Sequence, residues 1–176
     1  MFKSAKEIAF IGVVVSVLIG GQFVLSAFAG IEIITVILAV YCFTFGIVRG
    51  VITATAFSLL RCIVFGFFPH VVLLYLIYYN LFAVVVGLFG KWLKHSPLPI
   101  QIGVITVLCV LLVLIFTVID IVLNLWILGV VPPVAQKIYV VKSIPVAITQ
   151  ALSNAVIIPL CFYPLLKVFK KSNIIK

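Results

Sequence analysis

The sequence predicts an all-α integral membrane protein, a bundle of six transmembrane helices with both termini in the cytoplasm. Hydrophobic residues make up 66% of the 176 positions, charged residues make up only 9%, and the mean hydropathy is +1.51. Such values lie far outside those of a soluble globular domain. Because each spanning helix needs about 20 apolar residues, the chain has room for five or six spans with short connections, and we expect one membrane domain over residues 1–176.

Apolar runs divided by glycine, proline or charged residues give the expected elements. In chain order, the spans are predicted at about 8–28, 32–45, 49–67, 71–89, 100–128 and 143–168. We interpret the first as a retained helix, because its apolar run is too long for a cleaved leader and lacks a small-x-small cleavage site. The second is short, so we expect it to tilt or to be partly buried.

Proline marks the expected connections. Pro69 and His70 form a turn before the fourth span, because proline has no amide hydrogen to donate and disfavours helix in the residue before it. The polar stretch KWLKHSPLP ends the fourth span. The stretch GVVPPVAQKIYVVK is expected to form a second proline-marked loop before the sixth.

Twelve Lys and Arg residues, against only three acids, set the expected orientation. One side of the membrane receives Lys3, Lys6, Arg49, Lys91, Lys94, Lys167, Lys170, Lys171 and Lys176. The other side receives only Lys137 and Lys142. Because basic residues are enriched in cytoplasmic loops, both termini are expected inside. The same rule explains the positive charge without a nucleic-acid partner, for which the chain has no solvated face.

A few polar side chains interrupt the apolar runs, and their positions along the helices place them in the outer half of the membrane. Asn124 follows Asp120 by four positions and therefore shares its helix face. We expect a polar, aromatic-flanked, ligand-binding pocket that opens outward and is formed by Gln22, Glu32, Arg61, Tyr75, Tyr79, Asn80, Asp120, Asn124, Gln150 and Asn154. The alternative is that Arg61 and Asp120 form a buried ion pair while the amides bond across helices.

Catalytic and metal-binding patterns are missing from the sequence. HExxH and GxSxG motifs and paired intramembrane carboxylates do not occur, and His70 and His95 fall in loops on opposite sides. The four cysteines stand alone in apolar runs, without the spacing of a zinc or redox site. We therefore expect no enzymatic activity, no metal and no cofactor in this chain.

The first span carries a stripe of small residues. Ala5 and Ala9 lie four apart, and Gly12, Ser16 and Gly20 repeat that spacing. Such stripes let helix backbones approach closely in lipid. The stripe therefore predicts either a docking face for a partner or internal packing within the chain, and the pattern favours neither.

Several features together are those of one family of membrane proteins. They are the six short-looped spans, the Ala5 and Ala9 pair, the second-helix stretch GIEIITVILAVYCFTFGIVRG and the closing stretch LSNAVIIPLCFYPLLKV. Over nearly its whole length the chain resembles the S components, the substrate-binding membrane subunits of energy-coupling factor (ECF) vitamin transporters.

The resemblance implies a multi-pass protein of the plasma membrane of a Gram-positive bacterium, which captures a vitamin or related micronutrient on its outer side. Its partners would be a transmembrane coupling subunit (the T component), docked on the first helix, and two ATPase subunits that hydrolyse ATP. The S component would deliver its solute by toppling in the membrane. The second- and sixth-helix stretches look most like a branch for which a corrinoid such as cobalamin is the suggested ligand.

Two other functions stay open. A structural membrane protein resembling the rod-shape factor MreD would have similar size and span number, and it would need protein partners but no ligand. A proton-coupled carrier of small solutes would use Arg61 and Asp120 as its relay.

Overall fold

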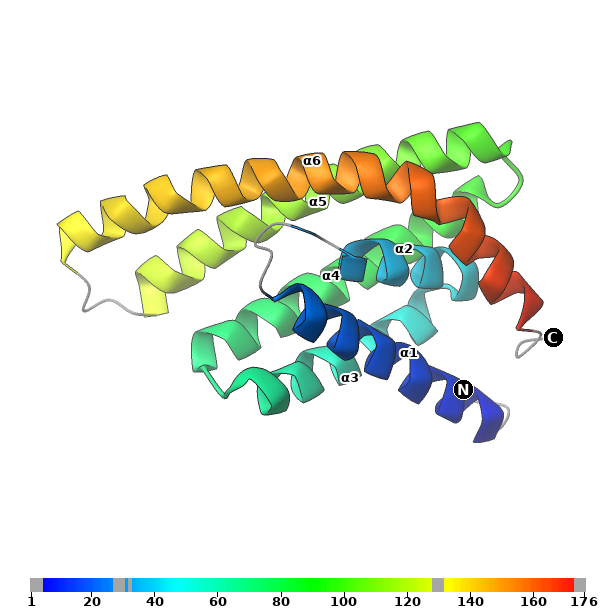
Figure 1. Cartoon of the computed structure of the whole chain (residues 1–176), viewed down its shortest axis with the longest axis horizontal. Coiled ribbons are helices and arrows are strands. Elements are labelled where there is room, and N and C mark those ends of the chain that lie inside the picture. Colours follow the sequence, from blue (N-terminus) through cyan, green and yellow to red (C-terminus); the bar gives the residue numbers. More distant parts are fainter. Residues whose placement is uncertain (1–4, 27–30, 32, 128–131, 173–176) are drawn as a thin grey trace.

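The computed structural model describes residues 5–26, 31, 33–127 and 132–172, and within these ranges every regular element is an α-helix (Figure 1). The helices are α1 (Ala5–Leu25), α2 (Ile33–Phe45), α3 (Ile47–Phe65), α4 (Pro69–Leu93), α5 (Leu98–Ile127) and α6 (Pro133–Lys171). All but α2 are long and apolar enough to cross a membrane. The all-helical membrane class is therefore confirmed, whereas six spans with cytoplasmic termini stay a prediction.

The short helix α2 lies at the centre of the bundle. It packs against every other helix, while the five long helices contact one another in the order α1, α3, α4, α5, α6 around it. Figure 1 shows α2 enclosed in this way, with the two termini at the same end of the molecule. A ring of long helices around one short helix is thus the arrangement that positions every site described below.

Helix α2 is apolar around its whole circumference, which suits a helix with neighbours on all sides. Eight of its 13 residues are buried. At about 1.5 Å per residue it is roughly 20 Å long, well short of the ~30 Å hydrocarbon core of a bilayer. The prediction that this segment is partly buried is confirmed, and burial inside the bundle is what a helix of this length requires.

Glycine allows the tightest contacts around α2. Gly46, with φ at 82°, is the single residue between α2 and α3, and its left-handed backbone permits the sharp reversal. On α4, a Cβ added at Gly90 would lie 2.8 Å from the Phe43 carbonyl oxygen, and one at Gly87 would lie 2.9 Å from the Ile47 nitrogen. Helix α4 therefore packs directly against the backbone of the α2–α3 reversal, as small residues permit in lipid.

The predicted loop over residues 129–142 is wrong from Pro133 onward. Helix α6 begins there and runs for 39 residues, with Pro145, Pro159 and Pro164 inside it. Proline is tolerated in the first helical turn, where the amide hydrogen has no helical partner, and the following VAQKIYVV has no residue that stops a helix. Lys137 and Lys142, which were assigned to a loop, consequently lie on α6.

We predict that Gly90→Ala destabilises the fold, because the added methyl group meets Phe43 backbone atoms that cannot move aside independently. The expected loss is about 1–3 kcal/mol of unfolding free energy, measured by unfolding the protein in mixed detergent micelles. Gly103→Ala on α5 is the control, since a Cβ there meets nothing within 4 Å. Equal stability of the two variants would contradict the close packing.

Candidate functional site

A small cavity lies where the first turn of α2 faces the middle of the surrounding helices. Its volume is about 60 Å³. Its lining comes from five helices and consists of Gln22, Ile34, Tyr75, Tyr78, Tyr79, Val113, Phe116 and Gln150. Four of these residues, Gln22, Tyr75, Tyr79 and Gln150, belong to the predicted pocket, so the structure brings them together.

A larger cavity of about 330 Å³ adjoins the first between α5 and α6. Its lining is Phe116, Thr117, Asp120, Tyr139, Lys142, Ser143, Val146 and Gln150. Phe116 and Gln150 line both cavities. The two spaces therefore form one neighbourhood, with an aromatic, amide-bearing part inside the bundle and a charged part between α5 and α6.

Tyr75 is the centre of the inner part. Its hydroxyl oxygen accepts a hydrogen bond from Nε2 of Gln22 at 3.0 Å. The guanidinium carbon of Arg61 lies 4.1 Å from the centre of the Tyr75 ring, and the Phe65 ring lies 5.3 Å away. A guanidinium over an aromatic face is attracted by the ring quadrupole. Arg61 therefore contacts the Tyr75 ring and helps to position this residue of the cavity wall, but Arg61 does not line the cavity itself.

Asp120 belongs to a hydrogen-bonded cluster that links α5 to α6. The Tyr139 hydroxyl donates to Oδ2 of Asp120 at 2.5 Å. The amide nitrogen of Asn124 lies 2.9 Å from Oδ1 of Asp120 and 2.9 Å from the Tyr139 oxygen. The cluster fixes the carboxylate at the wall of the larger cavity, where Lys142 supplies the opposite charge.

The alternative of a buried Arg61–Asp120 ion pair is wrong. Within the described residues Arg61 rests on aromatic rings and Asp120 bonds to Tyr139 and Asn124. Helices α3 and α5 do not touch, because α4 packs between them. The two residues therefore lie in separate surroundings, on helices that α4 keeps apart.

Two other predicted pocket residues, Asn80 and Asn154, lie elsewhere. Asn80 accepts a hydrogen bond from Thr55 at 2.9 Å and donates to the Leu76 carbonyl, so it joins α3 to α4 outside both cavities. Asn154 is fully buried, and within the described part of the chain its amide atoms have no hydrogen-bond partner. It lines neither cavity. Glu32 lies outside the described residues.

The small-residue stripe of α1 faces away from the bundle. Its members Ala5, Ala9, Gly12, Ser16 and Gly20 are all exposed. A Cβ added at Gly12 or Gly20 would meet nothing within 4 Å. The buried face of α1 is formed by other residues, namely Glu7, Ile11, Val14, Val15 and Leu18. Within the described residues, the stripe is therefore not used for internal packing.

Sequence reasoning missed two features of the structure. Tyr139 and Lys142 fall in the segment that the sequence predicts as a loop, so the predicted pocket does not include them. Glu7 was overlooked, although it is buried and forms an ion pair with the Nε group of Arg49. The rarity of acidic residues could have identified Glu7. The chain has only three, and an acidic side chain within a membrane protein is usually paired with a basic one.

The arrangement is suited to binding a small polar molecule. Aromatic walls, amides and one charge of each sign converge on a concave site, as in small-molecule pockets. Among the described residues, no group of three His, Cys, Asp or Glu side chains could hold a metal ion. Comparison of the chain with protein-family models, curated proteins and solved structures finds no match.

Two double-mutant cycles test the new assignment of Asp120. Asp120→Asn combined with Tyr139→Phe should show a coupling energy of about 1 kcal/mol in unfolding free energy, because the two side chains share a hydrogen bond. Asp120→Asn combined with Arg61→Gln should be additive to within about 0.5 kcal/mol, because the residues have no common partner. Additivity in the first cycle and coupling in the second would instead support an ion pair between Arg61 and Asp120.

Proposed function

We propose that this chain is the solute-binding membrane subunit of an ECF-type importer. The observation that carries the proposal is the pair of adjoining cavities: Gln22 and Tyr75 line the smaller one, Asp120 lines the larger one, and Gln150 lines both. Solute binding explains why costly polar groups converge inside an apolar bundle. ATP hydrolysis would belong to partner subunits, and this chain would catalyse no reaction.

The cavities favour a solute of modest size. The larger space, about 330 Å³, is at the lower end of the range for small-molecule sites, about 300–1,000 Å³. A corrinoid such as cobalamin is much larger than this space, so the geometry favours a smaller ring-bearing vitamin or related micronutrient. Aromatic walls would contact the ring, while Lys142 and Asp120 would bind polar groups of either charge.

The exposed stripe on α1 supports docking of the coupling subunit. Small residues are retained at helix contacts in lipid because they permit close backbone approach. Here the stripe has no such contact within the described part of the chain. A transmembrane helix of the T component, itself presenting a close-packing face, is the occupant that this proposal assigns to it.

We predict that the purified protein retains or binds a vitamin-sized solute and that Gln150→Ala weakens the binding. Gln150 lines both cavities, so loss of its hydrogen bonds should raise the Kd about tenfold. Mass spectrometry of copurified small molecules identifies the solute, and thermal stabilisation by a vitamin panel gives its Kd.

Gln136→Ala is the matched control, because Gln136 lies on α6 but lines neither cavity. The proposal requires its Kd to match that of the unaltered protein. If no vitamin copurifies and none raises the melting temperature, the structural, MreD-like function gains support instead.

We predict that Gly12→Leu abolishes ATP-driven uptake and leaves solute binding unchanged. The leucine would obstruct the stripe without crowding the bundle at its Cβ, since a Cβ at Gly12 meets nothing within 4 Å. Uptake by vesicles that contain all the partner subunits is the measurement. Gly103→Leu makes the same change at an exposed glycine of α5 and should retain uptake. Normal uptake by the Gly12 variant would contradict the proposal that the coupling subunit docks on the α1 stripe.

A further inference from the structure

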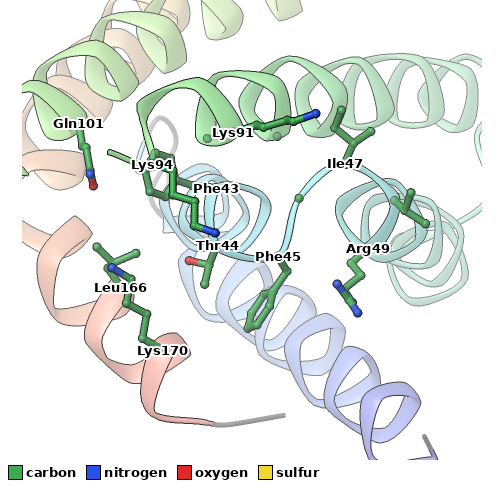
Figure 2. A pocket seen from close by; sticks show the side chains of 14 residues that line it. Phe43, Thr44, Phe45, Ile47, Arg49, Lys91, Lys94, Gln101, Leu166 and Lys170 are labelled. Carbon is green, nitrogen blue, oxygen red and sulfur yellow. The ribbon is translucent and has the colours of Figure 1, made fainter. Parts of the chain in front are cut away.

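A third and larger cavity lies at the opposite end of α2, near the chain termini. Its volume is about 490 Å³, and it is enclosed by the last turn of α2, the start of α3 and the ends of α4 and α6 (Figure 2). It shares no lining residue with the two cavities described above. A ligand here would therefore be bound separately from the proposed solute.

Four basic side chains line this cavity: Arg49 from α3, Lys91 from α4, Lys94 just beyond α4, and Lys170 from α6. Figure 2 shows them around the end of α2, with Lys94 extending toward Thr44. The positive-inside rule explains why basic residues accumulate at one end of a membrane protein. It does not explain why residues from separate helices surround one cavity.

The positive charge of this cavity is only partly compensated. Glu7 pairs with the Nε group of Arg49 and so compensates one of the four charges. Within the described residues, no carboxylate forms an ion pair with Lys91, Lys94 or Lys170. Like charges gathered without counter-charges repel one another, so an anion in the cavity would relieve this repulsion.

The rest of the lining is apolar. Phe43 and Phe45 are half-buried and Leu166 is buried, and together they form the wall between the basic side chains. Lysine and arginine bind phosphate oxygens strongly, whereas aromatic and aliphatic side chains favour the carbon skeleton of a ligand. The lining is therefore complementary to a molecule with a phosphate group next to an apolar part.

We propose that this cavity binds a phosphate group, carried by an anionic phospholipid or by a free organic phosphate. Arg49, Lys94 and Lys170 hold the phosphate oxygens, and Phe43 and Phe45 contact the adjoining carbon atoms. The site goes beyond solute capture, because it lies at the other end of α2 and its ligand is defined by charge. A bound lipid would join α3, α4 and α6 at this end of the bundle.

The test is a titration of the full chain, purified in a neutral detergent, followed by native mass spectrometry and by melting temperature. The probes are short-chain phosphatidic acid, phosphatidylglycerol, phosphatidylcholine and, separately, pyrophosphate. We expect phosphatidic acid and phosphatidylglycerol to bind in preference to phosphatidylcholine if the source is a lipid. Saturable binding of pyrophosphate without a comparable lipid preference would instead identify a free phosphate compound as the source.

The double variant K94Q/K170Q should raise the Kd for the preferred probe at least tenfold, because each lysine near an anionic lipid surface contributes about fivefold to affinity. The matched control K167Q/K171Q removes the same number of charges at the same end of the bundle, at exposed residues of α6 that do not line the cavity. It should change the Kd less than threefold.

Equal losses in the two double variants would overturn the proposal, because they would indicate general attraction to a basic surface. Failure of every phosphate-bearing probe to bind would overturn it as well. Melting temperatures without ligand check that the variants fold. If K94Q/K170Q melts well below the unaltered protein, K94Q alone is compared with K171Q, with an expected Kd ratio of about five.

Discussion

The length of α2 is the constraint on which the rest of this structure depends. A helix of 13 residues spans roughly 20 Å, whereas the helices around it have 19 to 39 residues. The bundle therefore has unfilled space beyond each end of its central helix. Ile34 in the first turn of α2 lines the cavity of the proposed solute site, and Phe43 and Phe45 in its last turn line the basic cavity. Both candidate sites thus result from one short helix within a ring of long ones.

Small residues serve two different purposes in this bundle, and only the structure distinguishes them. Gly87 and Gly90 on α4 face inward, and the backbone at Phe43 and Ile47 occupies the space that a side chain would need. Gly12 and Gly20 on α1 face outward into open space. In lipid there is no hydrophobic driving force for helices to associate, so close backbone approach is the main source of helix–helix affinity in both cases. The inward glycines join the chain to itself, and the outward ones are available to another protein.

The sequence was sufficient to predict the membrane class and the helical segments, because long apolar runs form helices whatever their neighbours are. The sequence was not sufficient to predict which helices lie side by side in the bundle. Arg61 and Asp120 were expected at one level, yet sequence contains no signal that α4 lies between their helices. Residues 133–142 were expected to form a loop because of Pro132 and Pro133, although proline at a helix start is favourable. That error hid Tyr139, the residue that positions Asp120.

The single-residue connection at Gly46 also bears on how the protein enters the membrane. An apolar segment of 13 residues is too short to be retained as an independent span, and its backbone ends would meet lipid without partners. Helix α2 is joined through Gly46 to the longer α3, so the two can insert as one hairpin during biosynthesis. Helices α1 and α3 contact the short helix first, and its remaining neighbours are added only as α4, α5 and α6 are synthesised. The last helices made are therefore needed to keep an early one in the bilayer.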